Sequence, residues 1–152
     1  MRHLKKVLKW LLPLLFLLFA AIQFVPVDRS NPPVEAAIAA PPDVQAILKR
    51  ACFDCHSNET VWPWYASVAP MSWLVAKDVR EGRKNINFSN WGKLTERKQA
   101  GAARAMWREV EEGKMPLPAY LSMHIEAELT EADKAALRAW AASLNGVQLE
   151  EE

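Results

Sequence analysis

The feature that most constrains this chain is its pair of cysteines, which stand three positions apart with a histidine directly after the second, in Cys52–Phe53–Asp54–Cys55–His56. This C-x-x-C-H pattern is typical of covalent c-type haem attachment. Each thiol adds to one porphyrin vinyl group, and cysteines so spaced on a helical turn reach the two vinyls of one haem edge. The adjacent histidine then supplies an axial nitrogen. We predict one haem c, held by Cys52 and Cys55 and ligated by His56.

Three other sites can use the same residues. A zinc site needs four ligands, which His124 would complete. A redox-active thiol pair belongs in a βαβ context, of which the sequence shows no sign. A disulfide across so short a loop would be strained and would leave His56 unexplained. A chain with only two cysteines and three histidines seldom contains the C-x-x-C-H pattern by chance, so haem attachment is favoured over these three alternatives.

The second axial ligand is predicted to be Met115, because methionine is a common partner of histidine in such cytochromes. It lies in a loop stiffened by Pro116 and Pro118, directly after a helix that Gly113 is expected to end. Met106 falls on the apolar face of that helix and is expected to pack in the core. The alternatives for the sixth position are His124, Met123, Met71, or an open or water-filled site.

The N-terminal segment is apolar and uncharged from Trp10 to Val27, and as a helix it would span roughly 27 Å. We predict an uncleaved transmembrane anchor over 1–27. The best small-x-small cleavage site, Ala37–Ile38–Ala39, comes about a dozen residues too late for a signal peptide; cleavage and a buried core helix remain the alternatives. Basic residues precede the run, so the N-terminus is expected in the cytoplasm of a bacterial cell, with the soluble domain on the periplasmic side of the inner membrane.

The remaining chain divides by composition into a linker over 28–42, a c-type haem-binding domain over 43–146 and an acidic tail over 147–152. Apolar spacing of three and four residues predicts helices beginning near Asp43, Trp73, Thr95 and Thr130. Asp43 can cap the first helix, and Thr130 and Asp133 have nearly the spacing of a capping box at the start of the last. The second is expected to end near Gly82, and the stretch 85–92 is expected to be irregular. No run alternates long enough for a strand, so the class is all-α.

The sequence blocks CFDCHSNET, WPWYA, APMSW, NFSNW and GKMPLPAY follow one another along the chain. In this order they resemble the bacterial haem-binding domain family of c-type cytochromes, over about residues 44–144. The resemblance implies a cytochrome-c-like helical domain around one covalent haem. Carried over to this sequence, it gives Cys52 and Cys55 as the attachment sites, His56 as the proximal ligand and Met115 as the distal ligand.

The predicted function is electron transfer by a membrane-tethered monohaem cytochrome, because an iron with both axial positions filled favours outer-sphere transfer. A redox partner protein, not identified by the sequence, is expected. The alternatives are a peroxidase-like enzyme with a displaceable sixth ligand and a haem-based redox or gas sensor. We expect no enzyme, since few acid–base residues lie near the motif. Nucleic-acid binding is not expected either, because the chain after its basic first residues is mildly acidic.

Overall fold

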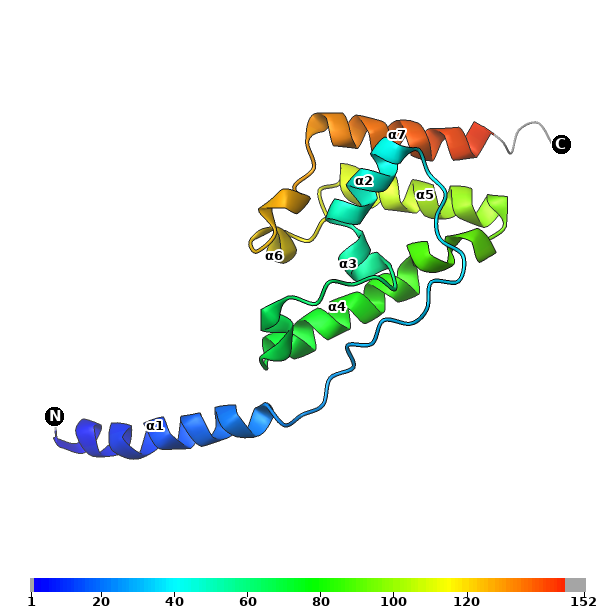
Figure 1. Ribbon diagram of the computed structural model, residues 1–152. Coiled ribbons are helices and arrows are strands. Elements are labelled where there is room, and N and C mark those ends of the chain that lie inside the picture. Colours follow the sequence, from blue (N-terminus) through cyan, green and yellow to red (C-terminus); the bar gives the residue numbers. More distant parts are fainter. Residues whose placement is uncertain (1, 147–152) are drawn as a thin grey trace. The chain divides into compact units, whose positions relative to one another are not determined.

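The computed structural model describes residues 2–146, and every regular element in this part of the chain is helical (Figure 1). The all-α prediction therefore agrees with the structure. The predicted acidic tail, 147–152, lies outside the described residues. The elements are α1 (Arg2–Ile22), α2 (Pro42–Ala51), α3 (Phe53–His56), η1 (Trp64–Ser67), α4 (Met71–Asn85), η2 (Phe88–Lys93), α5 (Glu96–Glu111), α6 (Pro118–Leu121), η3 (Ile125–Ala127) and α7 (Glu131–Gly146).

The chain forms two compact units. The first unit holds the residues up to Ser30 together with Trp62–Asp78. Its two segments are joined by a two-way amide contact, in which the Ala69 N–H donates to Gln23 Oε1 at 2.9 Å and Gln23 Nε2 donates to the Ala69 carbonyl at 3.2 Å. The second unit holds Asn31–Val61 and the described residues from Val79 onward, and it contains the C-x-x-C-H motif.

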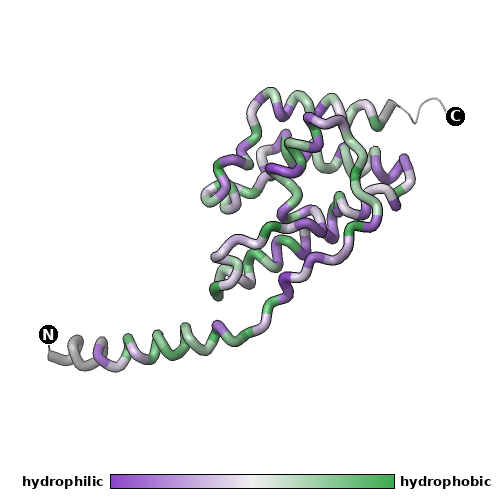
Figure 2. The backbone as a smooth tube through the Cα atoms, viewed as in Figure 1, coloured by the Kyte–Doolittle hydropathy of each residue, from purple (hydrophilic) through white to green (hydrophobic). Residues whose placement is uncertain are grey.

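The prediction of a transmembrane helix is wrong. Within residues 2–146, no helix is both long enough and apolar enough to cross a membrane. Figure 2 shows hydrophobic residues along much of α1, but the helix begins in the basic stretch and ends at Ile22, before the apolar run ends at Val27. The Gln23 side chain donates to the Phe19 carbonyl at 2.9 Å at this end. The helix therefore starts before the uncharged run starts and ends before the run ends.

The core of the second unit is built by α2, α5 and α7, with α5 packed along α7 and α2 against α7 (Figure 1). Their apolar spacing buries one face of each helix. A row of aromatic rings continues this core to the motif. Phe53 stacks on Phe88 with centroids 5.5 Å apart, Phe88 contacts Trp91 at 6.0 Å, and Trp91 contacts Trp140 of α7 at 5.8 Å. The motif is thus attached to the core by its own Phe53.

The predicted linker, 28–42, contains no helix before Pro42. Part of it nevertheless belongs to the second unit, because Ile38 is buried in the core. The backbone N–H groups of Ala36 and Ile38 donate to the carbonyls of Ser89 and Phe88, at 2.9 and 2.8 Å. These hydrogen bonds hold the segment in an extended form against η2.

The helix ends follow the predictions in part. The first predicted helix begins one residue early, at Pro42, so that Asp43 lies in its first turn and is not the cap. The helix predicted to end near Gly82 continues to Asn85 as α4. The next helix, α5, begins after Thr95 as predicted. Gly113 lies just beyond the end of α5 and has a φ of 67°, a left-handed conformation that glycine adopts without strain.

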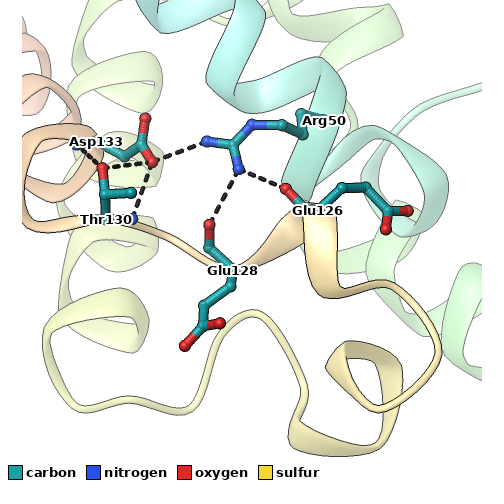
Figure 3. A network of polar contacts seen from close by, with 5 residues as sticks. All are labelled: Arg50, Glu126, Glu128, Thr130 and Asp133. Atoms are coloured by element: carbon teal, nitrogen blue, oxygen red, sulfur yellow. Dashed lines mark hydrogen bonds and ion pairs between the residues drawn. The ribbon is translucent and has the colours of Figure 1, made fainter.

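The start of α7 is fixed by the predicted capping pair, in which each side chain accepts a hydrogen bond from the backbone N–H of the other residue (Figure 3). Asp133 Oδ2 accepts from the Thr130 N–H at 2.9 Å, and the Thr130 hydroxyl accepts from the Asp133 N–H at 3.1 Å. The same carboxylate forms an ion pair with Arg50 of α2 at 2.8 Å. Arg50 also donates to the carbonyls of Glu126 and Glu128. One arginine therefore joins the end of α2 to the segment before α7.

Candidate functional site

The two cysteines and the histidine of the motif share one helical turn. The first helix of the second unit, α2, ends at Ala51, and the short α3 begins at Phe53. The N–H groups of Cys55 and His56 donate to the carbonyl of Cys52 at 3.2 and 2.9 Å. The turn therefore brings together Cys52, Cys55 and His56, as the spacing predicts.

The His56 ring is held in a defined tautomer. Its Nδ1 lies 3.2 Å from the carbonyl oxygen of Ile86. Because a carbonyl oxygen only accepts hydrogen bonds, Nδ1 carries the proton and Nε2 keeps its lone pair for a metal. Burial lowers the pKa of His56 below its ordinary value, against the smaller opposing effect of hydrogen bonds to the backbone of Ile86 and Gly82. The imidazole is therefore neutral near pH 7 and suited to bind iron.

A close approach between α4 and the motif positions this turn. At Gly82, a Cβ would collide with the carbonyl oxygen of Cys55 and would lie 3.2 Å from the Cys55 Cβ. The absence of a side chain at position 82 lets α4 continue past the motif while packing directly on its backbone. Gly82 is therefore required by this close approach and does not end the helix, contrary to the sequence prediction; α4 continues to Asn85.

A cavity of about 430 Å³ opens beside the motif, within the second unit. Cys52, His56 and Met115 all line it, so three of the four predicted site residues face the same cavity. The other lining residues are mostly apolar: Ala51, Asn85, Ile86, Phe88, Ala105, Met106, Glu109, Val110, Pro116 and Leu129. Its size and apolar character are those of an ordinary small-molecule or cofactor site.

Met115 reaches this cavity from the loop after α5. The backbone N–H groups of Lys114 and Met115 both donate to the carbonyl of Glu109, at 2.9 and 3.1 Å. This fixes the loop to the last turn of α5 as the chain turns at Gly113. Met115 is half-buried and packs against the core. A thioether in this place is a soft donor of the kind that haem iron accepts.

The alternatives for the sixth position do not line the cavity. Met123 is 56% exposed, and Met71 lies in the first unit and is 44% exposed. His124 stacks on Tyr120, with ring centroids 4.2 Å apart, and its Nδ1 lies 3.0 Å from Glu126 Oε1. Met106 does line the cavity, and it is buried in the core as predicted.

Cys52 and Cys55 are not joined in a disulfide. Burial, followed by the neighbouring Cys55, raises the pKa of Cys52 to about 12, so its thiol keeps its proton near pH 7. Across the described residues, no group of three or more His, Cys, Asp and Glu side chains is arranged to hold a metal ion. His124 stands with Tyr120 and Glu126 and is not part of such a group with the cysteines.

Sequence reasoning missed a polar network that supports the segment after His56. Arg83 of α4 donates through Nε to the Ser57 carbonyl at 2.7 Å and through Nη2 to the Thr60 hydroxyl at 2.9 Å. The buried Asn58 donates its N–H to the Ser89 hydroxyl at 2.8 Å and accepts from Asn87 Nδ2 at 2.8 Å. The sequence signal that could have predicted this network is the presence of two polar clusters, at 57–60 and 87–90.

These features define the class of the protein. The imidazole of His56, the thioether of Met115 and the thiol of Cys52 line an apolar cavity, and Cys55 lies on the same turn as Cys52; these groups fit a haem, whose iron takes nitrogen and sulfur ligands. The sequence profile of the haem-binding domain family matches residues 17–143, so the chain belongs to this family and has a haem-binding domain. No curated protein and no solved structure matches the chain.

Proposed function

We propose that this protein is a monohaem c-type cytochrome that transfers electrons, with haem bonded to Cys52 and Cys55 and ligated by His56 and Met115. The observation that carries the proposal is that Cys52, His56 and Met115 line one cavity, although the motif turn and the loop after α5 are far apart in the sequence. The resemblance of the motif region to c-type cytochromes supports the same assignment.

The residues of the chain would act as follows. Each thiol S–H adds across a vinyl C=C, so that sulfur bonds to one carbon and hydrogen to the other without net oxidation. His56 offers Nε2, because Nδ1 is engaged by the Ile86 carbonyl. Met115 would offer its sulfur from the loop after α5. The apolar residues that line the cavity would keep water away from the iron.

The bound haem supplies an iron that gains and loses one electron. With His56 and Met115 both bound, a substrate finds no free coordination position, which favours electron transfer over chemistry at the iron. A thioether stabilises the ferrous form more than a second imidazole does, so methionine ligation raises the reduction potential.

Covalent attachment is tested with the full chain produced together with a cytochrome c maturation system. Extraction with acidified acetone is expected to leave haem with the protein, because thioether bonds resist it. The double substitution Cys52→Ala/Cys55→Ala is expected to lose haem into the organic phase. Haem that extracts from the unsubstituted chain would contradict covalent attachment.

Electron transfer is tested by potentiometric titration combined with ligand binding. We expect a reversible one-electron transition and slow or weak binding of carbon monoxide by the ferrous protein, because Met115 fills the sixth position. Rapid, tight binding of carbon monoxide would favour a sensor or an enzyme with a displaceable ligand. Peroxide turnover at a high rate would favour the enzyme.

We also propose that the haem domain works outside the cytoplasm, since covalent attachment of haem c requires export, and that it exchanges electrons with a separate redox protein. The support is the C-x-x-C-H motif itself. Fractionation of cells that produce the full chain tests the location. Recovery of the haem-containing protein in the cytoplasm would contradict it.

A further inference from the structure

Asp54, between the two cysteines of the motif, is held at both oxygens of its carboxylate. The Val61 N–H donates to Oδ1 at 3.0 Å, and the Tyr120 hydroxyl donates to Oδ2 at 2.7 Å. The backbone carbonyl of Asp54 accepts from the Thr60 hydroxyl at 2.7 Å. The middle of the haem-attachment turn is therefore tied both to the segment that follows it and to a distant tyrosine.

That tyrosine lies in α6, shortly after Met115. The Tyr120 N–H donates to the Leu117 carbonyl at 2.9 Å, and its ring stacks on His124 with an interplanar angle of 12°. Burial, followed by the Asp54 carboxylate, raises the pKa of Tyr120 above its ordinary value. The phenol thus keeps its proton and remains a donor to Asp54.

The segment between Met115 and Tyr120 is consequently fastened to two different parts of the second unit. At its start, Met115 N–H is bound to the Glu109 carbonyl of α5. At its end, Tyr120 is bound to the motif turn. Pro116 and Pro118 lie between these points and restrict the backbone, so a displacement at Tyr120 is passed on to Met115.

We propose that Asp54 and Tyr120 are a positioning pair, whose hydrogen bond would hold the loop so that the Met115 thioether can bind the iron. This inference rests on the proposed function, in which His56 and Met115 are the axial ligands. The bond links the residue between the haem-binding cysteines to the loop that carries the other ligand. A hydrogen bond to a carboxylate is among the stronger ones available to a protein, and it resists movement of the loop away from the iron.

The test is the affinity of the ferric full chain for imidazole, an external ligand that must displace Met115. Tyr120→Phe removes one hydroxyl and is expected to tighten imidazole binding about tenfold, which corresponds to about 1.4 kcal/mol. The reduction potential should fall, because the methionine–iron bond is weaker. Ser122→Ala is the matched control, since the Ser122 hydroxyl bonds only within the same segment, to the Ala119 carbonyl at 2.7 Å among the described contacts. It should leave both quantities unchanged.

A second variant separates positioning from general stability. Asp54→Ala removes the acceptor of the Tyr120 hydroxyl and should tighten imidazole binding as well. The double variant should exceed Tyr120→Phe only slightly, because both changes break the same bond. A lowered melting temperature of Tyr120→Phe with unchanged imidazole affinity and potential would overturn the proposal.

Met115→Ala distinguishes this failure from that of the proposed function. If Met115→Ala opens the sixth position while Tyr120→Phe changes neither quantity, the positioning role alone is wrong. If Met115→Ala has no effect either, the ligand assignment falls with it.

Discussion

The two sides of the candidate haem site are built differently. His56 stands on a turn whose backbone is hydrogen bonded within itself, packed against Gly82 and followed by the network around Arg83. Met115 stands on a loop that is fastened by backbone hydrogen bonds to Glu109 and by the Tyr120 hydroxyl to Asp54. The histidine side is thus part of the packed core, whereas the methionine side is attached to it. If His56 and Met115 are the iron ligands, as proposed, the histidine would be fixed and the strength of the methionine bond would depend on a few contacts.

The largest expected effect separates the two methionines of the cavity. Met106→Ala removes a buried core side chain and should lower the free energy of unfolding by about 2–5 kcal/mol, while the low-spin ferric spectrum persists. Met115→Ala should cost less stability, because Met115 is only half-buried, but it should open the sixth position and give a high-spin or water-bound ferric haem. Denaturant unfolding and absorption spectra of the two variants measure this. The reverse pattern of spectra would make Met106 the ligand.

A matched pair of glycines tests how tightly the histidine side is packed. Gly82→Ala forces a Cβ into the Cys55 carbonyl and should destabilise the protein by about 1–3 kcal/mol, as overpacking does. Gly101→Ala in α5 meets nothing within 4 Å and should stabilise by up to about 1 kcal/mol, through helix propensity. Thermal unfolding of both variants decides. Equal effects of the two substitutions would show that the approach of α4 to the motif is looser than described.

A smaller effect concerns the Arg50–Asp133 contact, which braces α2 next to the motif. Burial acts to raise the pKa of Asp133, but hydrogen bonds from Thr130 and the contact with Arg50 outweigh it and hold the pKa below the ordinary 3.8. The native state therefore binds this proton less readily than the unfolded state. Its contribution to stability is fully present above pH 3.8 and is lost as the pH falls through the lowered native value.

Asp133→Asn should accordingly cost about 1 kcal/mol near pH 7, the usual value of a lost capping interaction. The difference from the unsubstituted protein should shrink as the pH is lowered, which urea unfolding at several pH values measures. Lys134→Ala serves as the control, because the Lys134–Glu131 pair is exposed on the same helix and pairs of this kind contribute little. A penalty for Asp133→Asn that persists unchanged at pH 3 would contradict the assigned cause.

Local sequence signals predicted backbone geometry well over short stretches of the chain. The C-x-x-C-H spacing, the Thr130–Asp133 cap and Gly113 each specify backbone geometry over a few residues, and the structure shows the corresponding turn, cap and left-handed glycine. Gly82 misled the prediction, because its role depends on Cys55, a residue remote in sequence. The Asp54–Tyr120 bond could not be predicted for the same reason.

The apolar N-terminal run shows the opposite limit of sequence reasoning. Hydropathy alone predicted a membrane-spanning helix from residue 10 to residue 27, but hydropathy does not specify where a helix begins and ends. In the structure, α1 includes the basic stretch and ends at Ile22, where the Gln23 side chain bonds to the Phe19 carbonyl. The extended segment that follows contributes Ile38 to the core of the second unit, which its composition gave no reason to expect.

The most direct test of the central claim, an iron between His56 and Met115, is X-ray absorption fine structure at the iron edge of the full-length ferric protein. We predict one sulfur and five nitrogen scatterers in the first shell, with the sulfur lost in Met115→Ala and retained in a Met106→Leu variant. A first shell of nitrogen and oxygen alone in the unsubstituted protein, or a sulfur that persists in Met115→Ala, would contradict the account.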